Sequence, residues 1–259
     1  MSEGVVAGVV NWHIGRCGSS VLGSLLAQHP AISYSNEIYS RYMPRRRGSS
    51  ELPSLESVLD HSEQSVLEGN LHLFEVKHLP DQNLGLYPHL KIYDWLNCFF
   101  RRGYRKHLLL SRRNGLRRIV SHLMAARSGQ YVLKSSLDLE PCQPIKVPLE
   151  RITHGFGIRS LVSWLEEYER GNLEVQKTLA ALQRANPELS WLELTYEDHI
   201  QDDPKKAYRE VCSFLDLPEV GVDLLQRKRN AEPLDVQIQN YSDVRDCLSA
   251  TRFAWMLDS

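Results

Sequence analysis

Short apolar runs alternate with helical patterns along this chain. Residues 5–13 are rich in β-branched side chains and predict a buried strand that runs into a helix. In that helix, apolar residues recur at helical spacing at Val21, Leu22, Leu25 and Leu26. Further strand-like runs, separated by helical patterns at 89–102 and 115–126, are 71–77, 106–111 and 191–195. Such alternation is typical of a central parallel β-sheet flanked by helices, so we expect an α/β fold.

A longer helical pattern covers residues 155–185, with an expected interruption near Gly171 and Asn172. Two polar stretches that contain proline or serine, 45–53 and 128–148, predict surface insertions. We find no internal repeat and no interdomain linker. The sequence therefore predicts a single domain over residues 1–259.

The composition is that of an ordinary globular protein, with 42% hydrophobic and 24% charged residues. The formal net charge of −1 provides no overall field that would attract nucleic acid or an anionic membrane, so we expect neither as a partner. An anionic ligand would have to be held by a local cluster of donors.

The cysteines and the N-terminal residues indicate the cellular compartment. Five widely spaced cysteines without a C-x-x-C pair argue against a disulfide framework or a zinc site and favour a reducing compartment. The first apolar run is too short for a membrane span, and no basic segment precedes it. We therefore expect a cytoplasmic protein with no signal peptide, no membrane span and no bound metal.

A glycine-rich turn between the first strand and the first helix is a candidate anion site. The segment 15–20 reads GRCGSS, in which small residues let backbone N–H groups surround an anion while Ser19 and Ser20 add hydroxyl donors. It lacks the Walker A spacing, because Arg16 precedes the second glycine and no lysine follows it. A purely structural turn is the alternative.

A second basic segment also follows a strand and enters a helix. In SRRNGLRRIVS (111–121), Asn114 can cap the helix. Ser121 follows Asn114 by seven residues, close to two turns, and so lies on nearly the same face. Arg113 and Ser121 could thus hold one phosphate, although such segments are also common on solvated helix faces.

The two segments together resemble those of sulfotransferases that use 3′-phosphoadenosine 5′-phosphosulfate (PAPS). GRCGSS is similar to the family's 5′-phosphosulfate loop, with Arg16 at the basic position and Cys17 in place of the usual serine. RNGLRRIVS is similar to the 3′-phosphate motif, which implies that role for Arg113 and Ser121. The resemblance extends over most of the chain and implies a P-loop-like sulfotransferase fold.

The resemblance also implies further donor contacts. The nucleotide-binding residues it indicates are Arg16, Cys17, Gly18, Ser19, Ser20, Arg113, Ser121, Tyr196, Arg227 and Lys228. Tyr196 begins the YED segment and would lie against the adenine, while Arg227 and Lys228 belong to a C-terminal basic segment that closes over the nucleotide in bacterial members.

Sulfuryl transfer needs cations near the leaving phosphate and a base for the acceptor hydroxyl. Arg16 and Lys77 are the candidate cations. Glu37 and His78 compete as the base, because HPAISYSNEIY resembles the segment of bacterial enzymes with a catalytic glutamate, whereas VKHLP resembles the histidine segment of small-molecule enzymes. The latter lacks one residue between Lys77 and the histidine, so we favour Glu37. We expect the neighbouring His13 and Glu75 to be structural or peripheral.

The sequence therefore predicts a PAPS-dependent sulfotransferase that releases 3′,5′-adenosine bisphosphate. The alternatives are a P-loop nucleotide kinase or hydrolase, and a module that binds PAPS without turnover. A carbohydrate, a tyrosyl side chain or another small molecule could be the hydroxyl acceptor, and the oligomeric state stays open.

Overall fold

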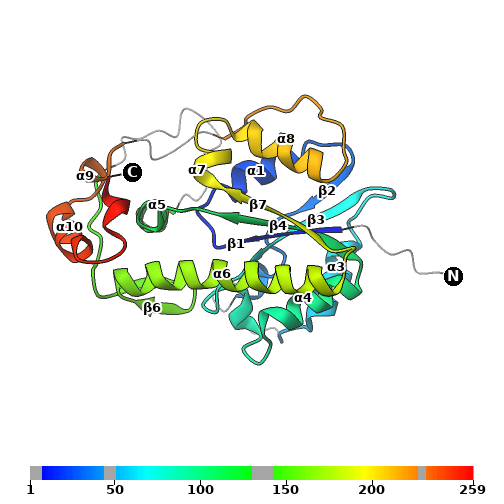
Figure 1. The fold of residues 1–259 in the computed structure, drawn as a ribbon, viewed down its shortest axis with the longest axis horizontal. Helices are drawn as coiled ribbons and strands as arrows, with labels where there is room; N and C mark the ends of the chain where they lie inside the picture. The colour runs from blue at the N-terminus through cyan, green and yellow to red at the C-terminus, as the bar shows by residue number, and fades with distance from the viewer. Residues whose placement is uncertain (1–7, 44–50, 130–142, 227–231, 259) are drawn as a thin grey trace.

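A computed structural model describes residues 8–43, 51–129, 143–226 and 232–258. Its centre is a five-stranded, fully parallel sheet with the strand order β2-β3-β1-β4-β7 (Figure 1). The strands are β1 (Gly8–His13), β2 (Ile32–Ser35), β3 (Leu71–Lys77), β4 (Tyr104–Ser111) and β7 (Ser190–Thr195). The predicted α/β class with a parallel sheet is confirmed.

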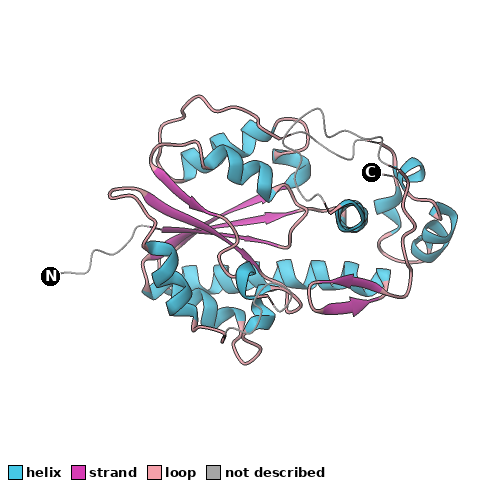
Figure 2. Cartoon of the chain, turned by 180° about the vertical axis from the view of Figure 1, so that it is seen from behind, coloured by secondary structure: helices cyan, strands magenta, loops and turns pink. Residues whose placement is uncertain are grey.

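Helices cover both faces of this sheet (Figures 1 and 2). One face packs on α1 (Ser19–Leu26) and α8 (Pro204–Phe214), and the other on α3 (Leu55–Glu63), α4 (Ile92–Arg101) and α6 (Leu161–Ala185). In β1, Val9 joins the first core and Val10 joins the second, because successive side chains of a strand point to opposite faces. A strand buried on both faces reads as a continuous apolar run, which explains why β1 was recognisable in the sequence.

The remaining elements lie mainly around the carboxyl ends of the strands. The helical ones are α5 (Gly115–Ser128), α7 (Tyr196–His199), α9 (Leu234–Gln237), α10 (Tyr241–Ser249), η1 (Ser40–Tyr42), η2 (Asn83–Leu86) and η4 (Ala254–Leu257). A third core cluster joins α5, α10 and η4 to the first half of α6. A small antiparallel hairpin, β5 (Ile152–His154) with β6 (Gly157–Arg159), lies beside it.

The predicted interruption near Gly171 is wrong. Helix α6 runs unbroken for 25 residues, and Gly171 lies where Leu79 packs so closely that a Cβ atom would come within 2.5 Å of its side chain. This glycine serves helix packing instead of ending the helix. The sequence also gave no sign of β2, whose four residues are too few for a clear alternation. Of the predicted insertions at 45–53 and 128–148, residues 45–50 and 130–142 lie outside the described part.

The sheet order creates a switch point between β1 and β4. The chain leaves β1 towards the side that carries β3 and β2, and leaves β4 towards β7 on the other side. In open α/β sheets, ligands bind at the carboxyl ends of the strands beside such a point. The segments that follow β1 and β4 are the two candidate anion sites.

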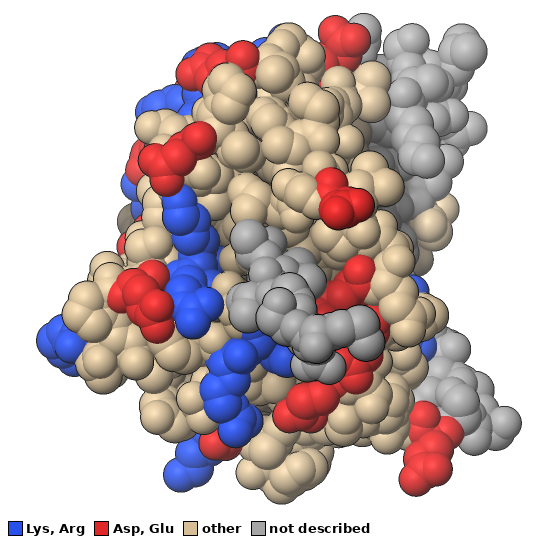
Figure 3. Space-filling view, turned by 90° about the vertical axis from the view of Figure 1, so that its right-hand side faces the viewer, with Lys and Arg blue, Asp and Glu red and all other residues tan. Residues whose placement is uncertain are grey.

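Within the described residues, no helix is both long and apolar enough to cross a bilayer. The face at which β1 begins carries basic and acidic side chains on neighbouring parts of its surface (Figure 3). This mixture agrees with the net charge of −1. The absence of a nucleic-acid partner stays a prediction.

Candidate functional site

The loop after β1 has the backbone of an anion cradle. Gly15, Arg16 and Gly18 have φ angles of +75°, +56° and +91°, so three of four consecutive residues are left-handed. Such turns aim neighbouring N–H groups to one side. Gly18 is the N-cap residue of α1 and has no side chain to accept from the first-turn N–H groups. A Cβ atom on Gly18 would come within 2.8 Å of Ile200.

Arg118 supports this loop from beneath, and the sequence analysis missed it. Its side chain is fully buried, donates to the carbonyl oxygen of Gly15 (2.8 Å) and to that of Ile14, and lies 3.7 Å from the centre of the Tyr168 ring. The signal was present, because Arg118 lies four residues after Asn114 and three before Ser121, on the same face of α5.

The second anion segment meets the first through its serine. Ser121 is buried on α5, and its Oγ accepts a hydrogen bond from Arg16 Nε at 3.1 Å. Asn114 caps α5 as predicted, with its side chain accepting from the N–H of Arg117 at 2.8 Å. Parallel pairing of β1 with β4 brings these two segments of the sequence together.

Arg113 lies apart from Ser121. Its guanidinium is half exposed and donates two 2.6 Å hydrogen bonds to the carboxylate of Asp198. The preceding arginine, Arg112, instead donates to the carbonyl oxygen of Arg16 (3.3 Å) and covers the ring of Tyr196 at 4.2 Å. Tyr196 therefore lies next to the loop, and the shared role of Arg113 and Ser121 stays a prediction.

The other predicted loop residues differ in exposure. Cys17 is fully buried against the sheet, whereas Ser19 is buried in the first turn of α1 and Ser20 is exposed. The amide of Cys17, and not its thiol, is thus available to the cradle. Arg227 and Lys228 lie outside the described residues.

Glu37 and Lys77 form an ion pair beside the loop. Lys77 Nζ lies 2.7 Å from Glu37 Oε2, and the hydroxyl of Ser40 donates to the same oxygen at 2.6 Å. The Lys77 side chain also passes the loop, since a Cβ atom on Gly15 would lie 3.3 Å from its Cε. Burial raises the pKa of Glu37, but Lys77, His13 and the Ser40 hydroxyl together outweigh it, and the pKa falls to about 2.

His78 is separate from this pair. It is buried against α6, where its Nε2 lies 3.0 Å from Asn172 Oδ1, and burial lowers its pKa to about 3. The histidine is therefore neutral and faces away from solvent. The structure places Glu37, and not His78, beside the candidate anion loop.

His13 and Glu75 lie at the base of the site, closer than the sequence analysis expected. The N–H of Gly15 donates to His13 Nδ1 at 3.0 Å, and His13 Nε2 lies 3.3 Å from Glu75. His13, Glu75 and Glu37 each offer an atom that could bind a metal, all within 4.8 Å of one another. The ammonium of Lys77 already neutralises Glu37 there. The expected absence of a metal stays a prediction.

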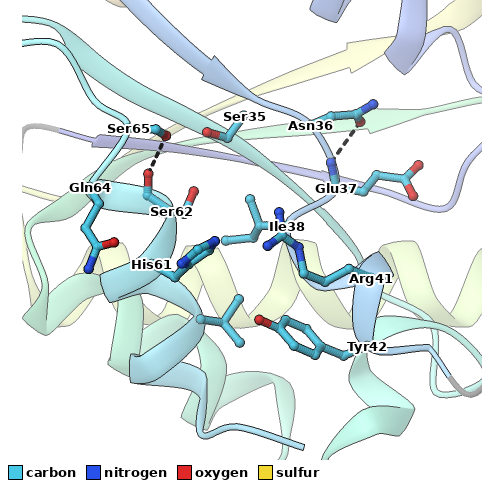
Figure 4. Close-up of a pocket in the computed structure, with 11 residues that line it drawn as sticks. Ser35, Asn36, Glu37, Ile38, Arg41, Tyr42, His61, Ser62, Gln64 and Ser65 are labelled. Carbon is cyan, nitrogen blue, oxygen red and sulfur yellow. Dashed lines mark hydrogen bonds between the residues drawn. The ribbon is translucent and has the colours of Figure 1, made fainter. Parts of the chain in front are cut away.

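A pocket of about 490 Å³ adjoins Glu37 (Figure 4). It lies between the segment that follows β2 and the helix α3, and most of the side chains that line it are polar. Glu37 stands at its edge with the carboxylate pointing away from His61. This pocket could not be predicted from the sequence, because its two walls are about 20 residues apart in the chain.

Comparison with known proteins gives a distant structural similarity. No protein-family model matches the chain, and no curated protein sequence matches it. A sulfotransferase from Alicyclobacillus acidocaldarius with a solved crystal structure is similar to it at 16% sequence identity, with a TM-score of 0.45. The match covers 96% of this chain and 93% of that one. The functional proposal below therefore rests on the residues of the site.

Proposed function

We propose that this chain is a sulfotransferase that moves a sulfuryl group from PAPS to a hydroxyl group of an acceptor. The main support for the proposal is that the two candidate anion-binding segments contact each other, through the 3.1 Å hydrogen bond from Arg16 to Ser121. A donor with a 5′ phosphosulfate and a 3′ phosphate needs two anion sites close together. The cytoplasmic location expected from the cysteines is part of the same proposal.

In this proposal the cradle binds the 5′ end of the donor. The N–H groups from Arg16 to Ser20, with the guanidinium of Arg16, hold the phosphosulfate, and Ser121 marks the adjoining 3′-phosphate site. Arg113 would exchange Asp198 for that phosphate. An exposed ion pair contributes little to stability, so the exchange costs little. Tyr196, held by Arg112, offers a ring to the adenine.

The reaction requires an in-line displacement at sulfur. The acceptor oxygen forms a bond to sulfur, and the bond from sulfur to the 5′-phosphate oxygen breaks with its electron pair on that oxygen. Lys77 and Arg16 stabilise the negative charge that grows there. The acceptor proton passes to the carboxylate of Glu37.

Binding of nucleotides separates this proposal from its alternatives. At 100 times its dissociation constant, a ligand of the folded state adds about 2.7 kcal/mol of stability. We expect 3′,5′-adenosine bisphosphate to stabilise the protein in thermal unfolding, and ATP with Mg²⁺ to have little effect. The reverse order would favour a kinase or hydrolase. Stabilisation by the bisphosphate without transfer from labelled PAPS to any acceptor pool would favour the binding module.

Arg113→Ala tests the 3′-phosphate assignment. Loss of a charge-assisted contact should weaken binding of 3′,5′-adenosine bisphosphate by about 2 kcal/mol, or about 30-fold. Binding of adenosine 5′-phosphosulfate, which lacks the 3′ group, should change much less. Arg184→Ala, at an exposed arginine in the last turn of α6, is the matched control. Equal losses for both ligands would remove Arg113 from this role.

A further inference from the structure

The floor of the pocket beside Glu37 presents two serine hydroxyl groups. The hydroxyls of Ser35 and Ser62, which line the pocket, each lie 3.1 Å from Nε2 of the buried His72. His72 Nδ1 lies 2.6 Å from the hydroxyl of Tyr104, and that hydroxyl donates to Glu63 at 2.9 Å.

This chain of hydrogen bonds fixes the direction of each donor. Because Tyr104 donates its only hydroxyl proton to Glu63, His72 Nδ1 must carry a proton and donate to Tyr104. Burial lowers the pKa of His72 to about 4, so the ring is neutral and its Nε2 is an acceptor. Because Nε2 has one lone pair, one of Ser35 and Ser62 donates to it at a time, and the other keeps its proton for a ligand. Both oxygens keep lone pairs, so such a floor can donate to and accept from hydroxyl groups.

The rim of the pocket carries positive charge. The Arg41 side chain extends towards Ile38 and His61, and all three residues line the pocket (Figure 4). Neighbouring carboxylates are already paired, with Glu37 bound to Lys77 and both Glu63 and Asp60 bound to Arg102. Among the described residues, Arg41 has no acidic partner. An anionic group on a ligand would supply one.

We propose that this pocket binds the acceptor, and that the acceptor is a small polyhydroxylated molecule with an anionic group, such as a sugar acid or a sugar phosphate. That this ligand is the sulfuryl acceptor rests on the proposed function. The serine floor binds hydroxyl groups, Arg41 and His61 bind the anion, and the hydroxyl that reacts extends past the pocket edge to the Glu37 carboxylate, which points away from His61. The volume lies in the range of small-molecule sites.

A tyrosyl peptide fits the same pocket less well. Its phenol ring could pack on Ile38, Val58 and the ring of Tyr42, but its single hydroxyl group would engage only part of the serine floor. An acidic peptide with one tyrosine therefore serves as a competing ligand in the test.

Direct binding tests the inference without turnover. Binding of D-glucuronate, glucose 6-phosphate, glucose and the acidic tyrosyl peptide is measured by titration calorimetry on the full chain. We expect one or both anionic sugars to bind about tenfold or more tightly than glucose. Glucuronate and the phosphate distinguish a carboxylate from a phosphate as the preferred anion.

Variants assign the effect to the pocket. Arg41→Gln should remove the preference for the anionic sugar over glucose. Ser35→Ala should weaken the binding of glucose and of the anionic sugar alike. Arg184→Gln should change neither the preference nor the affinities. Equal affinity for neutral and anionic sugars, a preference that survives Arg41→Gln, or tight binding of the tyrosyl peptide alone would overturn the inference.

The nucleotide experiment separates this inference from the proposed function. If 3′,5′-adenosine bisphosphate stabilises the protein but the sugars show no dependence on charge, the inference is wrong and the proposed function stands. If anionic sugars bind through Arg41 and the bisphosphate does not bind, the ligand class of the pocket stands and the proposed function is wrong.

Discussion

At the scale of single residues, opposed effects set the pKa of Glu37. Burial alone would raise it, but Lys77 at 2.7 Å, helped by His13 and the Ser40 hydroxyl, lowers it to about 2. A carboxylate held in this ion pair is a weak base. If Lys77 turns to the phosphate of a bound donor, burial is opposed only by His13 and the Ser40 hydroxyl, and the pKa of Glu37 rises. The proposed base would then become stronger only when the donor is present.

Glu37→Gln keeps the shape of the side chain and removes its basicity. We expect kcat to fall by about 10²–10⁴-fold with nearly unchanged donor binding, because positioned bases contribute that much. His78→Asn, at a buried residue bonded to Asn172, should lower stability and affect kcat much less. Steady-state kinetics with labelled PAPS provide the measurement. A near-normal Glu37→Gln enzyme beside an inactive His78→Asn enzyme would exchange the two roles.

At the scale of elements, the register of β1 beside β4 builds the site. His13 at the end of β1 pairs with Lys77 at the end of β3 and with Leu110 near the end of β4. The segments that follow these three strands therefore leave the sheet side by side at the same edge. Local patterns predicted these strands and the cap at Asn114. They could not predict that Arg16 would meet Ser121, because that contact depends on which strands are neighbours.

Other parts of the site were missed for physical reasons. Arg118 looks like a surface residue in the sequence, and only the carbonyl groups of Ile14 and Gly15 explain its burial. The pocket floor depends on His72, which in the sequence is one polar residue inside an apolar strand. The identity of a buried polar partner is a matter of tertiary contact, and periodicity does not report it.

Gly18→Ala tests how tightly the loop is built. The alanine would carry a left-handed φ of +91° and a Cβ within 2.8 Å of Ile200, so both strain and crowding oppose it. Gly69→Ala is the matched control, because φ there is +82° but nothing lies within 4 Å. Left-handed strain costs about 1–2 kcal/mol. We expect Gly18→Ala to lower the free energy of unfolding in urea by clearly more than Gly69→Ala, and equal losses would show that the loop relaxes freely.

At the scale of the whole molecule, several histidines are buried in the neutral form. Burial lowers the pKa of His78 and of His107 to about 3, and that of His72 and of the partly buried His122 to about 4. The unfolded chain binds protons at these residues near pH 6.5. The contribution of these four histidines to stability is therefore full above that pH and falls as the pH drops towards 4, whereas His13, whose pKa is raised to about 10 beside Glu75, acts in the opposite sense above pH 6.5.

The fall should be steep, because each proton bound only by the unfolded chain contributes about 1.4 kcal/mol per pH unit. Urea unfolding between pH 4 and pH 7 measures it. His107→Asn should reduce the slope of stability against pH even though it destabilises the protein at every pH. His89→Gln, at an exposed residue, should leave the slope unchanged. A pH-independent stability over this range would contradict the expectation.

Cys17 gives the anion loop a chemical reporter. Its thiol lies wholly inside the core, although both neighbours belong to the cradle, so a thiol-reactive dye reaches it only when the loop opens. In a variant whose other four cysteines are replaced by serine, the labelling rate thus measures how often the loop opens. A ligand that binds the closed loop slows the labelling, so the labelling rate of Cys17 reports how much of the protein has a ligand in the cradle.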